Sequence, residues 1–135
     1  METKEIRKQK VVITYGTFDM FHFGHERLLK RCKEQGDILI VGVATDEYNV
    51  QKGKKAVQSF EDRLKYVESL PYVTRAIPET GINPQWYEDY EKYGVDVIIM
   101  GDDKVGELDY LKKDMNLVYL PRTKEVSSTE IREAI

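Results

Sequence analysis

Short apolar runs alternate with helix-like segments along most of the chain, and this alternation restricts the possible folds more than any other feature. The runs are rich in Val, Ile and Leu without polar alternation, which is typical of strands buried on both faces of a parallel sheet. Amphipathic segments lie between them and end near glycine or proline. The expected strands cover residues 11–15, 38–43, 73–77, 95–100 and 117–120. The expected helices cover residues 24–35, 60–70, 84–93 and 127–135.

This order of elements predicts an α/β fold. Right-handed crossovers place helices on both faces of one parallel sheet, which gives a single-domain Rossmann-like arrangement. With 135 residues and no internal repeats, the chain has room for one hydrophobic core. We assign residues 11–135 to this domain and the charged residues 1–10 to a flexible leader. Ligands bind beyond the carboxyl ends of such strands, so the site should be lined by the loops after Tyr15, Val43, Met100 and Leu120.

Charge and composition exclude several classes of function. A formal net charge of -3 does not attract nucleic acid, so an anion site has to come from a local arrangement of side chains. The one cysteine, Cys32, cannot form an intramolecular disulfide. No apolar run has membrane-spanning length, and the start of the chain lacks the apolar core of a secretory signal. We therefore expect a cytoplasmic protein that binds neither nucleic acid nor membrane.

The two histidines of the chain, His22 and His25, follow the first expected strand at the start of a helix. A helix amino end presents free N–H groups and a partial positive charge. A spacing of i, i+3 lets the two rings converge, and Gly24 lets a ligand approach the backbone closely. Imidazoles add hydrogen-bond donors, and when protonated they add charge. These features favour a phosphate site.

Three other interpretations of the histidine pair stay open. The rings could be polar surface, or they could cap the helix without a further function. They could also belong to a metal site, although zinc usually needs three or four ligands and no third ligand stands at a suitable spacing.

The segment GTFDMFHFGH at residues 16–25 resembles the HxGH-bearing first motif of the cytidylyltransferases, within the wider nucleotidyltransferase superfamily. The likeness extends over nearly everything after residue 10. It is closest to the small bacterial glycerol-3-phosphate cytidylyltransferases of teichoic acid synthesis. Further motifs follow in that family's order: TDEYN at 45–49, QKGKKA at 51–56, FEDR at 60–63, VIIMGDD at 97–103, YLPRT at 119–123 and SSTEI at 127–131.

This resemblance implies transfer of CMP from CTP to a small phosphorylated alcohol, with glycerol 3-phosphate as the expected acceptor, Mg²⁺ as the cation and a homodimer as the assembly. It gives catalytic roles to His22, His25, Lys52 and Arg122. It assigns acceptor contacts to Asp19, Lys52 and Arg63, with Asp19 also near the metal. The implied nucleotide-binding residues are Gly16, Thr17, Phe18, Gly24, His25, Lys54, Gly101, Asp103, Arg122, Thr123, Ser128 and Thr129.

Several of these motifs also have an ordinary structural explanation. The lysine-rich residues 52–55 are typical of a solvated turn, and we leave Lys55 as surface. A turn is expected at residues 101–103 in any case, and residues 127–130 form a capping box. Trp86 could stack on a base, but we favour packing.

Departures from the family leave the acceptor open. Pro71 stands where relatives have an arginine that helps the active site and the dimer contact. Either Arg75 supplies that charge or the acceptor differs. Lys104 replaces a tryptophan, and the loop at residues 124–126 is one residue shorter and lacks a glycine. A different phosphorylated acceptor, adenylyl transfer from ATP and a nucleotide-binding module without turnover are therefore kept as alternatives.

Overall fold

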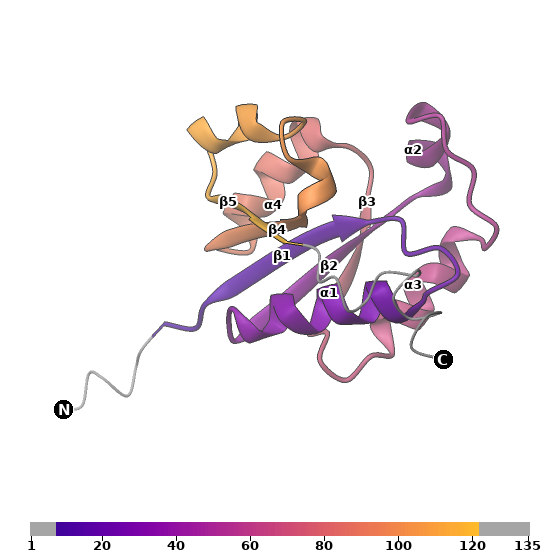
Figure 1. Ribbon diagram of the computed structural model, residues 1–135, viewed down its shortest axis with the longest axis horizontal. Coiled ribbons are helices and arrows are strands. Elements are labelled where there is room, and N and C mark those ends of the chain that lie inside the picture. The colour runs from indigo at the N-terminus through magenta and orange to yellow at the C-terminus, as the bar shows by residue number, and fades with distance from the viewer. Residues whose placement is uncertain (1–7, 122–135) are drawn as a thin grey trace.

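The structure is a computed structural model that describes residues 8–121. This part of the chain forms a five-stranded sheet with the strand order β3-β2-β1-β4-β5, and every neighbouring pair is parallel (Figure 1). The strands are β1 (Val11–Gly16), β2 (Ile38–Ala44), β3 (Arg75–Glu79), β4 (Val97–Gly101) and β5 (Leu117–Leu120). The expected α/β fold with a single parallel sheet is confirmed.

Helices and short helical turns connect the strands. The α-helices are α1 (Phe23–Glu34), α2 (Asp46–Gln51), α3 (Phe60–Glu68) and α4 (Tyr87–Lys92). A π-helical turn, η2 (Ile82–Trp86), leads into α4, and two 3₁₀ turns, η3 (Asp102–Lys104) and η4 (Asp109–Lys113), lie between β4 and β5. The helix expected at residues 127–135 lies outside the described residues.

Several element predictions needed correction. Strands β3 and β4 begin at Arg75 and Val97, each two residues later than expected, and the single helix expected at residues 84–93 is divided between η2 and α4. Helix α2 was not expected at all. It begins because the side chain of Thr45 accepts a hydrogen bond from the Tyr48 N–H at 3.1 Å, which caps the helix.

The sheet carries a hydrophobic cluster on each face because successive strand residues point to opposite sides. On β1, Ile13 and Tyr15 belong to the cluster beneath η2, α4 and η4, while Val12 packs on the opposite face with Leu29 of α1 and Val67 of α3. Figure 1 shows α1 and α3 on one side of the sheet and α4 with the orange turns on the other. Both faces are covered, as the continuous apolar strands required.

Hydrogen bonds fix the backbone from Lys10 onward. The Lys10 N–H donates to Asp37 Oδ2 at 2.8 Å, and its carbonyl accepts from the N–H groups of Asp37 and Ile38. The ordered fold therefore includes Lys10, the last residue of the expected leader. Within residues 8–121, no helix combines the length and the apolar character needed to cross a membrane.

Candidate active site

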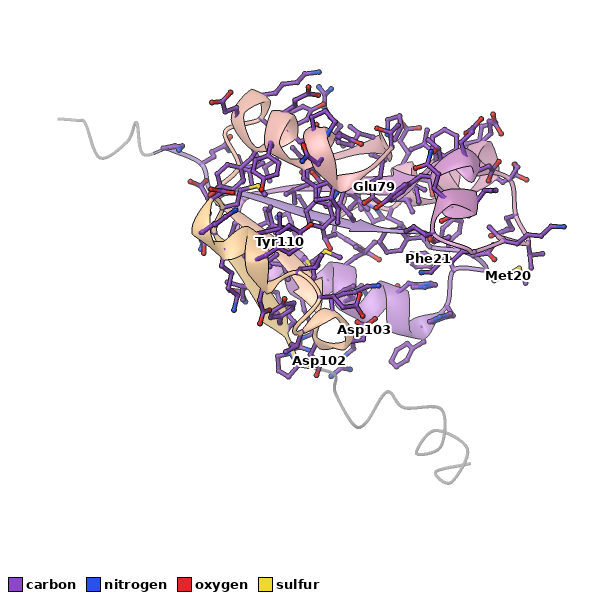
Figure 2. The ribbon with its side chains drawn as sticks, turned by 90° about the horizontal axis from the view of Figure 1, so that it is seen from above. Met20, Phe21, Glu79, Asp102, Asp103 and Tyr110 are labelled. Carbon is purple, nitrogen blue, oxygen red and sulfur yellow. The ribbon has the colours of Figure 1, made fainter. Side chains whose placement is uncertain are left out.

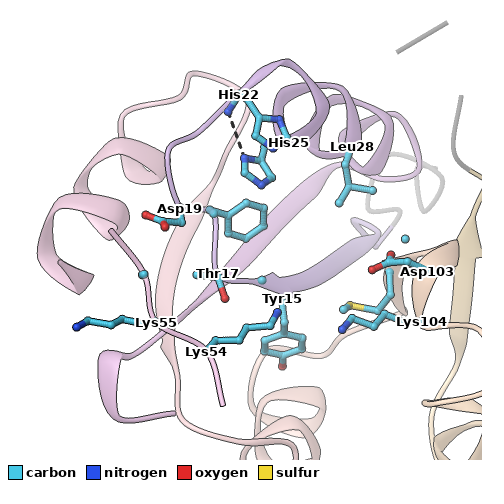
Figure 3. Close-up of a pocket in the computed structure, with 15 residues that line it drawn as sticks. Tyr15, Thr17, Asp19, His22, His25, Leu28, Lys54, Lys55, Asp103 and Lys104 are labelled. Carbon is cyan, nitrogen blue, oxygen red and sulfur yellow. Dashed lines mark hydrogen bonds between the residues drawn. The ribbon is translucent and has the colours of Figure 1, made fainter. Parts of the chain in front are cut away.

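A cavity of about 530 Å³ opens at the carboxyl edge of the sheet (Figure 3). Its walls come from the loop after β1, the start of α1, the segment at residues 54–56 and the turn after β4. This is the edge where the parallel topology predicted a ligand site. The expected site residues that line it are Gly16, Thr17, Phe18, Asp19, His22, His25, Lys54, Gly101 and Asp103.

The two histidines cap α1 through their Nδ1 atoms. The Gly24 N–H donates to Nδ1 of His22 at 3.1 Å, and the His22 N–H donates to Nδ1 of His25 at 3.2 Å. This is a reciprocal capping box in which imidazoles replace the usual hydroxyl and carboxylate. The histidines therefore do cap the helix, with the Gly24 backbone N–H as one donor, and this capping leaves Nε2 of each ring for a further role.

The caps also determine which ring nitrogen carries the proton. Because Nδ1 of each ring accepts a hydrogen bond, a neutral His22 or His25 carries its proton on Nε2. The rings stack with centroids 3.7 Å apart and an interplanar angle of 21°. The Nε2 atoms are thus the ring nitrogens that the caps do not use, and as N–H donors at the amino end of α1 they are suited to phosphate oxygens.

His25 is neutral at physiological pH in this structure. Burial, followed by the neighbouring His22, lowers the pKa of His25 to about 4. The rings of Phe18 and Phe21 lie 5.5 and 5.2 Å from its ring and exclude water. At pH 7 the site therefore offers imidazole N–H donors, and His25 does not add the positive charge that its sequence position allowed.

The loop after β1 is tightly packed and carries backbone strain. Phe18 has a φ of 55° and Met20 a φ of 48°, both in the left-handed region that non-glycine residues rarely adopt. A Cβ on Gly16 would lie 2.9 Å from the Phe18 ring, so glycine is required there. The Thr17 hydroxyl donates to Asn49 Oδ1 of α2 at 3.0 Å. The loop is held in one shape beside the histidines.

Asp19 is oriented by backbone donors. Its two carboxylate oxygens accept from the N–H groups of Val57 and Gln58 at 2.7 and 3.0 Å. Desolvation acts to raise its pKa, but these hydrogen bonds and the charge of Arg63 hold the pKa below its usual value. Asp19 is thus an anion on the cavity wall with lone pairs that remain for a ligand.

Lysines approach the cavity from opposite sides. In Figure 3, Lys54 and Lys104 point toward the centre, whereas Lys55 points away from it. Lys104, which stands in place of the family tryptophan, therefore adds a cation to this wall. Lys52, the C-cap residue of α2, lines a smaller neighbouring cavity, where its ammonium lies 4.4 Å from the Tyr48 ring.

Arg63, an expected acceptor contact, lies beneath the site and lines neither of the two cavities. Its side chain is 1% exposed. The guanidinium donates to the carbonyls of Gln58, Thr17 and Ala44 at 3.0, 2.9 and 2.8 Å and pairs with Asp46 at 2.7 Å. It ties together the backbone after β1, the end of β2 and the start of α3, which makes it a positioning residue for the loop that carries the histidines.

The other expectations have mixed outcomes. Trp86 is buried and stacks on Tyr15 with centroids 4.2 Å apart, so the packing interpretation is confirmed. Arg75 pairs with Ile40 at the amino end of the sheet and lies over the Tyr93 ring, so it cannot replace the family arginine at the site. The predicted site residues Arg122, Thr123, Ser128 and Thr129 lie outside the described residues.

Sequence reasoning missed two groups near the site. Lys104 was noted only as a departure from the family, although the turn after β4 places it on the cavity wall. Glu79 was not considered, because a single acid at the end of a strand resembles any surface carboxylate in sequence. Glu79 lies at the carboxyl end of β3, on the edge of the sheet where a ligand site was predicted, and this position could have identified it as a candidate site residue.

A doubly wound sheet with a histidine pair beside a cavity after its first strand is the architecture of a nucleotidyltransferase. The chain belongs to the cytidylyltransferase-like family, whose model matches residues 13–134. It is 48% identical over 126 residues to the glycerol-3-phosphate cytidylyltransferase of Bacillus subtilis (strain 168), covering 93% of this chain and 97% of that protein. The protein of that name from Staphylococcus aureus (strain NCTC 8325 / PS 47) is 47% identical, with 93% and 95% coverage.

A solved structure shares the fold. The lipopolysaccharide core biosynthesis protein from Thermoplasma volcanium GSS1 superimposes with a TM-score of 0.72 at 29% identity, over 87% of this chain and 98% of that one. The family resemblance expected from the motifs and the Rossmann-like nucleotidyltransferase fold are both confirmed.

Proposed function

We propose that this protein is a glycerol-3-phosphate cytidylyltransferase, which transfers CMP from CTP to glycerol 3-phosphate and releases CDP-glycerol and pyrophosphate. The curated relatives that carry this name match almost the full length of the chain. The structural observation that carries the proposal is the stacked pair of Nε2–H imidazoles at the start of α1, which faces a cavity of about 530 Å³ together with lysine side chains.

The reaction needs no covalent enzyme intermediate. An oxygen of the acceptor phosphate attacks the α-phosphorus of CTP in line, a new P–O bond forms, and the bond to the bridging α–β oxygen breaks. The electron pair leaves with pyrophosphate. His22 and His25 donate their Nε2–H groups to the α-phosphate oxygens, where negative charge develops in the transition state. Because the helix caps fix both rings, little reorganisation is needed during the reaction.

Positive charge holds the ends of the substrates. Lys54 and Lys104 face the cavity and are placed to bind nucleotide phosphates, while Lys52 serves the acceptor phosphate from the smaller cavity. Gly101 and Asp103 at the end of β4 contact the cytosine or the ribose. The predicted phosphate contacts of Arg122, Thr123, Ser128 and Thr129 remain part of this proposal.

Mg²⁺ fits this site as an ion shared with the nucleotide. Among residues 8–121, no group of three or more metal-ligating side chains is present. Mg²⁺ commonly binds one or two carboxylates together with substrate phosphates, and Asp19 is an oriented carboxylate on the cavity wall. The ion neutralises phosphate charge when bound. Asp19 is the residue that would hold it.

The proposal includes a cytoplasmic location, because CTP is an intracellular substrate. It also includes a homodimer. Exposed apolar side chains gather near the start of α1 and on α3, where Phe21 and Tyr66 have ring centroids 4.9 Å apart and Tyr66 is 50% exposed. Met20 and Phe23 are 56% and 50% exposed in the same region. Burying this patch against a second copy stabilises a dimer. Sedimentation of the wild-type protein and of Tyr66→Lys tests this assembly.

Pyrophosphate release with purified protein tests the function. CTP and ATP are each offered with glycerol 3-phosphate, ethanolamine phosphate and another polyol phosphate. Rapid turnover of CTP with glycerol 3-phosphate is the expected result. Preference for ATP, or for a different acceptor, rejects the proposed substrates. CTP binding without turnover on any acceptor identifies a non-catalytic nucleotide-binding module.

A further inference from the structure

A second, smaller cavity of about 160 Å³ adjoins the main one. The two share Tyr15, Gly16, Thr17, Lys54, Met100 and Lys104 on their walls, so they are immediate neighbours. The residues that belong to the smaller cavity alone include Glu79 at the end of β3, Trp86 of η2 and Lys52 after α2. This volume accommodates a few water-sized groups and is too small for a nucleoside.

Glu79 is the buried acid of this cavity. Glu79 is only 3% exposed, and Figure 2 labels it among the side chains over the sheet. Trp86 donates its indole N–H to Oε2 at 3.0 Å. Within residues 8–121, no hydrogen-bond donor reaches Oε1, and this atom is not sealed from the cavity. One carboxyl oxygen is therefore anchored, and the other is left to accept a hydrogen bond from a ligand.

A chain of packed and hydrogen-bonded side chains holds the anchor. The Trp86 ring stacks on Tyr15 at an interplanar angle of 10°. The Tyr15 hydroxyl donates to Asp89 Oδ2 at 2.9 Å, and Gln85 Nε2 donates to the same oxygen at 2.9 Å. Trp86 cannot rotate without breaking this arrangement, so the direction of the Glu79 carboxyl group is fixed. A pre-oriented acceptor of this kind is what discriminates between ligands.

Opposite charges face Glu79 across the cavity. Burial raises the pKa of Glu79 to about 7, while the Trp86 hydrogen bond and the ammonium groups of Lys52, Lys104 and Lys54 act against this rise. Tyr15, Tyr48 and Glu107 complete the polar lining. Three cations beside one acid with a free oxygen suit a ligand that carries a phosphate at one end and a hydrogen-bond donor at the other.

We propose that Glu79 selects the acceptor substrate by accepting a hydrogen bond from a hydroxyl group of its polyol part, while Lys52, on the wall of the same cavity, holds its phosphate. The inference rests on the proposed function and deepens it, because it identifies what distinguishes a polyol phosphate from a simple alkyl phosphate. A site that hydrogen-bonds a hydroxyl group of its substrate rejects an analogue that lacks this hydroxyl, because the polar group of the protein is then left unpaired.

The test compares acceptors within one enzyme. The ratio of kcat/KM for glycerol 3-phosphate to kcat/KM for n-propyl phosphate, which lacks the hydroxyl groups, is measured for the wild type and for Glu79→Gln. The amide keeps an oxygen for Trp86 but replaces the free anionic acceptor with an N–H donor. We expect the ratio to fall at least tenfold in E79Q, with the affinity for CTP alone, measured by calorimetry, unchanged. Because both acceptors meet the same folded protein, a loss of stability cannot mimic this change.

Glu68→Gln is the matched control, since Glu68 is an exposed acid on α3 away from both cavities. It should leave the ratio at the wild-type value. An E79Q ratio equal to that of the wild type overturns the role of Glu79 while the proposed function stands. A wild-type protein that rejects glycerol 3-phosphate and uses ethanolamine phosphate overturns both, because Glu79 would then face an ammonium group.

Discussion

The buried carboxyl group of Glu79 should make the stability of this protein depend on pH in a specific way. Its pKa is raised from 4.5 to about 7 by burial in the folded protein. Between these values the folded state keeps a proton that the unfolded state has lost. The free energy of unfolding contributed by this group is therefore greatest below pH 4.5 and is lost as the pH rises through 7.

The size of this effect follows from linkage. A difference of about 2.5 pKa units corresponds to about 3 kcal/mol, of which about 2.5 kcal/mol falls between pH 5 and pH 8. The Glu79→Gln variant cannot ionise, so it avoids this loss. The free energy of unfolding of E79Q minus that of the wild type should therefore be about 2.5 kcal/mol larger at pH 8 than at pH 5. Other titrating groups are common to both proteins and cancel in the comparison.

Urea unfolding followed by circular dichroism at pH 5, 6, 7 and 8 measures this difference. Glu68→Gln, which removes an exposed acid, should show almost no change across the same range. If the stability difference between E79Q and the wild type were the same at pH 5 and pH 8, the carboxyl group would not have a raised pKa, and the reasoning about its burial would be wrong.

Three further predictions concern the chemistry at the site and the packing of the residues that support it. His25→Ala should lower kcat by on the order of 10²–10³ with a smaller change in KM, since its Nε2–H acts chiefly in the transition state; an unchanged kcat in steady-state assays would remove it from the mechanism. Arg63→Met should lower the free energy of unfolding in urea by on the order of 3 kcal/mol, because three backbone carbonyls lose their donor, and a loss below about 1 kcal/mol would contradict this role. Gly42→Ala should lower the free energy of unfolding by about 1–3 kcal/mol, since the new Cβ would clash with the Tyr15 ring. An unchanged melting temperature in thermal unfolding would contradict this, because it would mean that the ring can move aside.

Sequence alone was sufficient for the strands with continuous apolar runs, whereas β3 (Arg75–Glu79) has few apolar residues and was predicted two residues too early. It was also sufficient for the main cavity, since parallel strands bring their carboxyl ends to one edge and the segments after β1, β2 and β4 meet there; the loop expected after Leu120 lies largely outside the described residues. Helix α2 was missed because its six residues are too few for an amphipathic pattern, and the Thr45 cap was its main signal.

Individual side-chain roles were harder to predict. The FEDR motif identified Arg63 as a functional residue, but sequence cannot show whether a guanidinium faces a cavity or the backbone beneath it. The second cavity depends on a tryptophan, a tyrosine and an acid contributed by three separate segments. Only the assembled packing of β1, β3 and η2 brings these groups together.

The two histidines serve the folding of α1 and the lining of the cavity at the same time. The same imidazoles that cap the first turn of α1 through Nδ1 also line the main cavity. Any change that removes a ring therefore also loosens the start of the helix. Evolution could not silence this site one histidine at a time without a cost in folding, and an engineer who wants an inert but stable variant should first supply Ser or Asp as a replacement cap.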